Sequence, residues 1–143
     1  GLDISTEMLA TARKALTAEG NFDARLKRGD AAHFDAATFN AAGFDRIMIS
    51  YALSMIPEWQ RTIAMALAAL NPGGSLHIAD FGQQAGLPGW FKSALIGWLT
   101  RFHVAPRADL LAVIEREIAG RPYRLEFKAH ARDYAWLVVV PRL

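Results

Sequence analysis

The sequence predicts an α/β protein with a parallel sheet, helices on both faces of that sheet, and an antiparallel hairpin at the C-terminal end. Strand-like and helical stretches alternate as far as Asp80, and this alternation is typical of a parallel sheet. The residues Asn71–Gly74 separate a helical stretch from a buried strand, because proline and glycine break helices. Two strand-like runs, 123–129 and 134–140, are joined by a link too short for a crossover, so they form a hairpin.

Local signals justify the individual elements. Asp3 ends a first strand, and Ser5 is a suitable N-cap for a helix at 6–18, where apolar residues recur at helical spacing. Pro57 suits the first turn of a later helix, because the N–H that it lacks would be unpaired there. The other expected elements are strands 25–28, 44–50 and 75–80, helices 88–102 and 108–119, and an apolar stripe of Trp59, Ile63, Ala66, Leu67 and Leu70 on the helix after Pro57.

Length and composition predict one domain over residues 1–143. With 52% hydrophobic and 21% charged residues, the chain has enough apolar side chains for a buried core. The absence of cysteine excludes disulfides, thiolate metal sites and cysteine nucleophiles. The formal net charge is only +2 and the basic residues are scattered, which argues against nucleic acid as a partner. No apolar run reaches the roughly 18 residues of a membrane span, and we expect a cytoplasmic protein.

Acidic residues stand at the carboxyl ends of the expected strands, where open α/β sheets bind their ligands. Asp3 offers two acceptor oxygens, which suits the vicinal hydroxyls of a ribose. Asp30 can accept from an exocyclic amine such as that of adenine, and Gly29 before it lets the backbone approach a flat ring. A single such aspartate is usually a cap or turn residue, but two at successive strand ends favour a nucleoside site.

Four motifs together resemble class I S-adenosylmethionine-dependent methyltransferases: GLDIS followed by EML, then GDA, FDRIMISYALSMIP and LNPGGSLHIADFG. The resemblance spans nearly the whole chain. It implies a Rossmann-like methyltransferase sheet, S-adenosylmethionine as cofactor, and methyl transfer to a small-molecule or lipid acceptor. It places the ribose on Asp3, the adenine amine on Asp30, and the methionine and methyl end beside the segment from Ser50. The implied cofactor-binding residues are Asp3, Ile4, Gly29, Asp30, Ala31, Ser50 and Tyr51.

One part of the family pattern is missing from these residues. The first strand of the family and its glycine-rich GxGxG loop would lie before Gly1, and in the family that strand runs between those ending at Asp3 and Ser50. We therefore expect an N-terminally incomplete domain that lacks its first strand and helix. The position between those two strands should be empty or collapsed, and the isolated chain should be inactive and marginally stable.

A closer resemblance is carried by SYALSMIPEWQ, ADFGQQAGLPGWF, RFHVAPR and RDYAW, which are similar to bacterial N-methyltransferases that make betaine lipids from diacylglyceryl homoserine. It implies an amine acceptor, which must lose a proton before transfer. The candidates to orient the acceptor or take that proton are Tyr51, Asp80 and His103, in that order. The aromatic stripe in 90–102 either packs on the fold, which we expect, or covers the substrate or touches the inner membrane surface as a peripheral contact.

Two other functions stay open at this point. A nicotinamide (NAD)-dependent Rossmann enzyme also places an acid on ribose at the end of its second strand, although the terminal hairpin and the LNPGG turn argue against it. A non-catalytic fragment or degenerate nucleoside-binding domain is the second alternative. His33, His77 and His130 lack the spacing of metal ligands, so we expect no metal.

Overall fold

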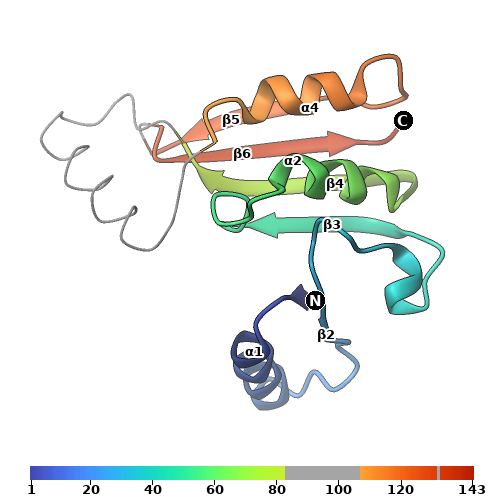
Figure 1. Ribbon diagram of the computed structural model, residues 1–143, viewed down its shortest axis with the longest axis vertical. Coiled ribbons are helices and arrows are strands. Elements are labelled where there is room, and N and C mark those ends of the chain that lie inside the picture. The colour runs from blue at the N-terminus through green and yellow to red at the C-terminus, as the bar shows by residue number, and fades with distance from the viewer. Residues whose placement is uncertain (83–106, 132) are drawn as a thin grey trace, which may run out of the picture.

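The computed structural model of the chain describes residues 1–82, 107–131 and 133–143 (Figure 1). They form a mixed α/β fold with two sheets, a two-stranded one of order β1-β2 and a four-stranded one of order β3-β4-β6-β5. The predicted α/β class is therefore confirmed. The helix expected at 88–102, with its aromatic stripe, and the candidate His103 lie outside the described residues.

Most elements lie where the sequence predicts them. Helix α1 covers Thr6–Ala18 and strand β3 covers Phe44–Ser50, both at the expected bounds. Ser5 caps α1 as predicted, since its Oγ accepts from the backbone N–H of Met8 at 3.2 Å. The other elements are β1 (Leu2–Asp3), β2 (Lys27–Arg28), a 3₁₀ helix η1 (Ala36–Phe39), α2 (Trp59–Ala68), β4 (Leu70–Phe81), α4 (Leu110–Ile118), β5 (Glu126–His130) and β6 (Ala135–Pro141).

Strand β4 corrects the prediction that Asn71–Gly74 separate a helix from a strand. The strand already begins at Leu70, which pairs with Phe44, and the register then shifts so that Arg46 faces Ser75. The four residues therefore form an irregularity inside the strand. Gly74 is required there, because an added Cβ would lie 2.9 Å from the backbone oxygens of Asn71 and Phe44.

Helix α2 also begins later than expected. Pro57 lies in the turn before the helix, which starts at Trp59. The reason is the preceding turn, in which the N–H groups of Met55 and Ile56 both donate to the carbonyl of Ala52, at 2.9 and 3.2 Å. The first helical hydrogen bond accordingly runs from Thr62 N to Glu58 O at 3.0 Å.

The predicted C-terminal hairpin is confirmed, because β5 and β6 pair antiparallel. Strand β6 also pairs antiparallel with β4, so it lies between β4 and β5 in the sheet. Strand β5 begins at Glu126 rather than at Tyr123, which forms only an isolated bridge with Arg142.

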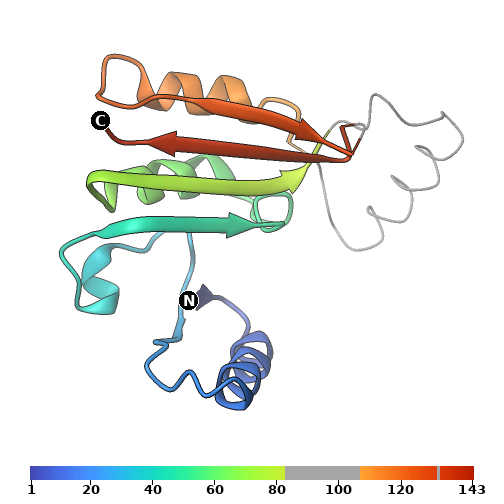
Figure 2. The same ribbon diagram turned by 180° about the vertical axis from the view of Figure 1, so that it is seen from behind.

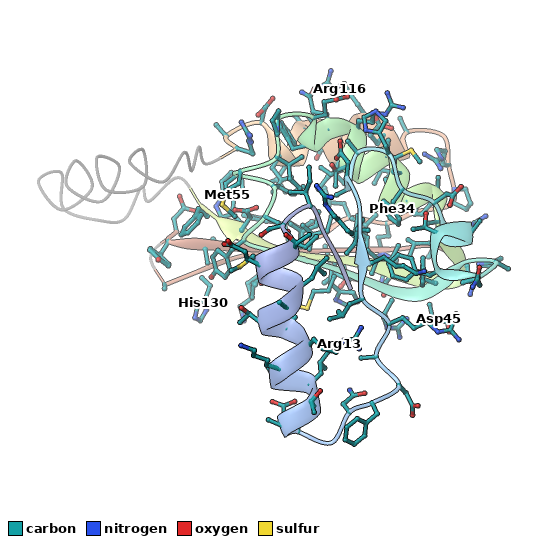
Figure 3. The ribbon with its side chains drawn as sticks, turned by 60° about the horizontal axis from the view of Figure 1, so that its bottom comes forward. Arg13, Phe34, Asp45, Met55, Arg116 and His130 are labelled. Carbon is teal, nitrogen blue, oxygen red and sulfur yellow. The ribbon has the colours of Figure 1, made fainter. Side chains whose placement is uncertain are left out.

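Helices α2 and α4 cover one face of the four-stranded sheet, as Figures 1 and 2 show from its two sides. On the opposite face Met48 and Leu137 are 71% and 41% exposed, and none of the described helices covers them. Helix α1 contacts β1 and β2 instead, and Arg13 on it donates to the carbonyl of Ala24 at 2.9 Å (Figure 3). The core consists of apolar side chains from the helices and the covered face, including Ile63, Leu67, Leu76, Ile78, Ile114, Val138 and Val140.

Strands β1 and β3 are not neighbours in a sheet. In the described residues each pairs on one edge only, β1 with β2 and β3 with β4, both in parallel. A hollow of about 930 Å³ lies between them, lined by Leu2 and Asp3 on one side and by Phe44, Ile47 and Ile49 on the other. This arrangement agrees with the expected vacant position between the strands that end at Asp3 and Ser50. Within the described residues no helix has the length and apolarity needed to cross a membrane.

Candidate functional site

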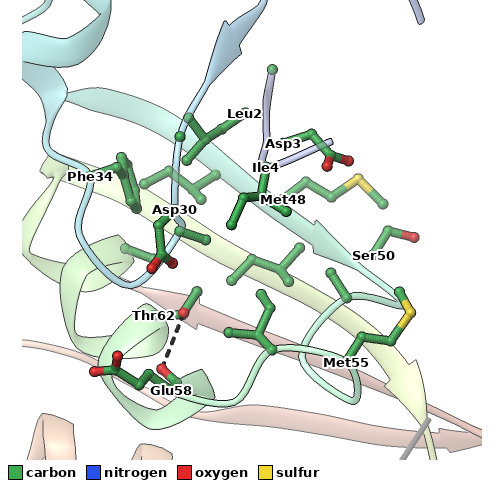
Figure 4. A pocket seen from close by; sticks show the side chains of 18 of the residues that line it. Leu2, Asp3, Ile4, Asp30, Phe34, Met48, Ser50, Met55, Glu58 and Thr62 are labelled. Atoms are coloured by element: carbon green, nitrogen blue, oxygen red, sulfur yellow. Dashed lines mark hydrogen bonds between the residues drawn. The ribbon is translucent and has the colours of Figure 1, made fainter. Parts of the chain in front are cut away.

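The hollow brings together most of the predicted cofactor-binding residues. It is lined by the segments that follow β1, β2 and β3, and Figure 4 shows Asp3, Asp30 and Ser50 around it. Tyr51 does not line it, and the wall continues instead with Ala52. Six of the seven predicted residues therefore share one cavity: Asp3, Ile4, Gly29, Asp30, Ala31 and Ser50.

Asp3 has one carboxylate oxygen engaged and one available. Its Oδ1 accepts a hydrogen bond from the backbone N–H of Ser5 at 2.8 Å, which fixes the turn into α1. Among the described residues no hydrogen bond reaches Oδ2. An ionised carboxylate in this state can still accept from a hydroxyl donor in the hollow. The geometry therefore suits a ribose contact at Asp3.

Asp30 is held by a backbone N–H and by a histidine that the sequence analysis considered only as a metal ligand. Its Oδ1 accepts from Ala32 N at 2.9 Å, and its Oδ2 lies 3.0 Å from Nδ1 of His33. The hydrogen bond from Ala32, followed by that from His33, holds the pKa of the Asp30 carboxyl below its usual value. Asp30 is therefore ionised near neutral pH and can accept from an amine. The i,i+3 spacing of Asp30 and His33 is the signal that could have revealed this pair.

The two loops that carry these aspartates are tied to each other. Gly29 N donates to the carbonyl of Asp3 at 3.0 Å, and Arg28 Nε donates to the carbonyl of Ile4 at 3.2 Å. A Cβ on Gly29 would lie 3.0 Å from Cδ1 of Leu2, which is tighter than most Cβ contacts. Close packing of the loop on β1 is thus one reason for a glycine at this position, and the approach of a flat ring stays a prediction.

Tyr51 stands at the end of β3 in an unusual backbone conformation. Its φ is 49°, in the left-handed region that non-glycine residues seldom adopt. Its N–H donates to the carbonyl of Ala79 at 2.7 Å, and its ring packs edge-on against Phe81 with centroids 5.0 Å apart. The side chain remains 39% exposed, so it can reach a molecule outside the hollow.

Asp80 occupies a different environment from that of an exposed proton acceptor. It is 3% exposed, its Oδ2 accepts from Ser54 N at 3.2 Å, and its Oδ1 accepts from Phe81 N at 2.8 Å. Both oxygens are thus engaged by backbone groups. This geometry favours an anchoring role for Asp80 over the predicted proton transfer.

Arg107 is a functional candidate that the sequence analysis did not identify, although it ends the RFHVAPR motif. Its guanidinium donates to carbonyl groups of the segment after β3, and it lies over the ring of Trp59 at 5.6 Å. About fifty residues separate it from its partners, so no local spacing could have shown the contact. Within the described ranges, no group of three His, Asp or Glu side chains could hold a metal ion.

Comparison with known proteins shows which family the chain belongs to. A family model described as "Methyltransferase domain" matches residues 1–74, which include both aspartates and β3. The demethylmenaquinone methyltransferase of Listeria monocytogenes serotype 4a (strain HCC23) is 30% identical over 90 residues, which are 63% of this chain and 36% of that protein. The chain thus matches about a third of the length of that curated relative.

Solved structures show the same fold. An S-adenosylmethionine-dependent methyltransferase from Mesorhizobium loti superposes with a TM-score of 0.70 at 19% identity, covering 99% of this chain and 79% of that one. An O-methyltransferase family 2 protein from Planctomyces limnophilus DSM 3776, solved with apigenin, gives a TM-score of 0.68 at 24% identity, covering 99% and 42%. These likenesses establish a Rossmann-like fold of the methyltransferase type. With more than half of its residues matched by the family model and two acidic strand ends on one hollow, the chain belongs to the methyltransferase domain family.

Proposed function

We propose that this domain binds S-adenosylmethionine and transfers its methyl group to a small-molecule or lipid acceptor. One observation carries the proposal: Asp3 and Asp30, on loops joined by the Gly29–Asp3 hydrogen bond, line the same hollow in a domain of the methyltransferase family. Two carboxylates at adjacent strand ends match the hydroxyl and amine donors of a nucleoside.

The residues present fit the nucleoside half of this cofactor. Asp3 would accept from the ribose through its available oxygen, and Asp30 would accept from the adenine amine beside Ala31. Ser50 and the segment after it would face the methionine end. When bound, S-adenosylmethionine supplies a methyl group activated by a positively charged sulfur, so the protein mainly has to align it and exclude water.

Tyr51 is the leading candidate to orient the acceptor. It directly follows β3, its ring is held by Phe81, and its side chain is partly exposed beside the rim of the hollow. For an amine acceptor, its phenol oxygen can accept the hydrogen bond that directs the lone pair. His103 stays a second candidate, and Asp80 is assigned to holding the loop.

The relatives support a small organic acceptor without fixing its class. The curated relative is named for demethylmenaquinone, and the Planctomyces limnophilus structure holds apigenin. We keep the amine of a lipid headgroup, suggested by the motif resemblance, as the finer proposal. Because we expect the isolated chain to be inactive, the acceptor test uses the chain extended before Gly1 by the strand and glycine-rich loop of the family. Transfer of a labelled methyl group to matched amine, phenol and quinol acceptors then decides among these classes, and labelling of the quinol alone would overturn the amine assignment.

Calorimetric titration of the chain with S-adenosylhomocysteine and, separately, with NADH tests the cofactor. Binding is a suitable readout because the proposed nucleoside contacts lie entirely within the described residues. We expect S-adenosylhomocysteine to bind and NADH not to bind. Binding of NADH alone would support the nicotinamide alternative, and binding of neither would support a degenerate domain.

A further inference from the structure

Arg107 holds the segment after β3 through several backbone groups at once. We call residues 51–57 the post-β3 loop. Arg107 Nε donates to the carbonyl of Leu53 at 3.1 Å, and its Nη2 lies 3.0 Å from the carbonyl oxygen of Ile56 and 3.4 Å from that of Ser54. A single guanidinium thus satisfies three carbonyl groups within four residues, which its planar fork of donors permits.

The post-β3 loop is held from its other side by Asp80. The carboxylate of Asp80 accepts from Ser54 N at 3.2 Å, so the same residue is fixed through its N–H and through its carbonyl. Leu53 and Ser54 are fully buried, at 0% and 1% exposure. The guanidinium of Arg107 also lies over the Trp59 ring at 5.6 Å, which links the loop to the first turn of α2.

This loop forms part of the wall of the candidate cofactor site. Ala52, Met55, Ile56 and Pro57 all line the hollow, which Asp3 and Asp30 also line. Two of the carbonyl groups that Arg107 satisfies belong to buried residues, and buried carbonyls without partners are costly. Without Arg107 the loop would therefore rearrange toward water, and the wall of the hollow would move with it.

We propose that Arg107 is a positioning residue for the cofactor site: it fixes the post-β3 loop in the conformation that forms the methionine-end wall of the hollow. The inference rests on the proposed function, because it assumes that S-adenosylmethionine occupies this hollow. Arg107 touches neither cofactor nor acceptor in this account and acts through the loop alone.

The test compares three variants of the chain by titration with S-adenosylhomocysteine. Arg107→Ala should weaken binding about tenfold, which corresponds to roughly 1.4 kcal/mol. Arg107→Lys should give an intermediate loss, because an ammonium is a point charge and cannot span three carbonyls. Arg121→Ala is the matched control, since Arg121 also donates to a backbone carbonyl, that of Glu117 at 3.0 Å, and stacks on an aromatic ring, that of Tyr123 at 5.0 Å. Arg121 does not line the hollow, so the Arg121→Ala variant should bind S-adenosylhomocysteine as tightly as the unaltered chain.

Chemical rescue separates positioning from a general loss of stability. Millimolar guanidinium should restore part of the affinity of Arg107→Ala by occupying the vacated position, whereas a merely destabilised protein would bind no better in this denaturant. Unchanged affinity in Arg107→Ala, or an equal loss in Arg121→Ala, would overturn the inference.

Hydrogen exchange distinguishes failure of this inference from failure of the proposed function. In Arg107→Ala the N–H groups of Ser54, Met55 and Ile56 should exchange faster while those of β6 stay protected. If the unaltered chain binds no S-adenosylhomocysteine, the proposed function fails, and the cofactor role of Arg107 fails with it. Unchanged exchange in the post-β3 loop would show that Arg107 does not hold the loop at all.

Discussion

The backbone N–H of Gly29 donates a hydrogen bond to the carbonyl oxygen of Asp3 at 3.0 Å. This bond lies at the end of the short β1–β2 pairing, beside the pair of Asp3 with Arg28, and joins the two loops that follow these strands. The carboxylates of Asp3 and Asp30 thereby line one hollow although 27 positions separate them in the sequence.

Acid should weaken the fold partly through Asp30. Its pKa is lowered by hydrogen bonds from Ala32 and His33, so the ionised form stabilises the folded state above the ordinary value of 3.8. That contribution is lost as the pH falls through the lowered pKa. Urea denaturation between neutral pH and about pH 2.5 should therefore show a shallower acid dependence for Asp30→Asn than for the unaltered chain. Asp23→Asn, at an exposed position, is the control, and identical pH profiles for Asp30→Asn and the unaltered chain would contradict the assignment.

The two faces of the four-stranded sheet should respond differently to truncation. Ile78, on the face covered by α2 and α4, is 2% exposed, so Ile78→Ala should cost about 2 to 5 kcal/mol of unfolding free energy. Met48, on the opposite face, is 71% exposed, and Met48→Ala should cost less than about 0.5 kcal/mol. Chemical denaturation measures both values. If Met48→Ala lowered the free energy of unfolding as much as Ile78→Ala, the face of the sheet that carries Met48 would also be packed.

Local stability should be lowest in the unit formed by α1, β1 and β2. Helix α1 has no buried residue, and β1 and β2 pair over two residues only. Hydrogen exchange should therefore give the amides of 6–18 much less protection than those of β4 and β6, which pair over seven residues. Equal protection would show that this unit is integrated into the core. The marginal stability expected for the whole chain stays a prediction, which calorimetric unfolding would measure.

Sequence patterns predicted the elements whose signals are local. The Ser5 cap and apolar spacing located α1, and β-branched residues located β3. Tertiary pairing decided the rest: Leu70 pairs with Phe44, so Asn71–Gly74 are held inside β4 despite their composition. A helix breaker can stand inside a strand as an irregularity when the residues on either side of it pair with a neighbouring strand, as Leu70 and Ser75 do with β3.

The residues of the candidate site likewise fall into those that a local sequence signal identifies and those that it does not. Asp3 and Asp30 were identifiable because the ends of strands are visible in the sequence, and the structure brings them to one hollow. The burial of Asp80 between two backbone N–H groups has no local signature, nor does the contact of Arg107 with the post-β3 loop. Both depend on how distant segments pack, which residue spacing alone does not report.

The most direct measurement is the affinity of Asp3 variants for S-adenosylhomocysteine by calorimetry. Asp3→Ala removes the proposed ribose acceptor and should cost about 2 to 4 kcal/mol, a loss of roughly thirty- to thousandfold. Asp3→Asn keeps an Oδ1 that can accept from Ser5 N, so it should preserve the turn into α1. Its affinity for S-adenosylhomocysteine should still fall about tenfold or more. Asp23 is exposed and does not line the hollow, so the Asp23→Asn variant should bind S-adenosylhomocysteine as the unaltered chain does. Binding to Asp3→Ala that is as tight as to the unaltered chain would contradict the nucleoside site on which the account depends.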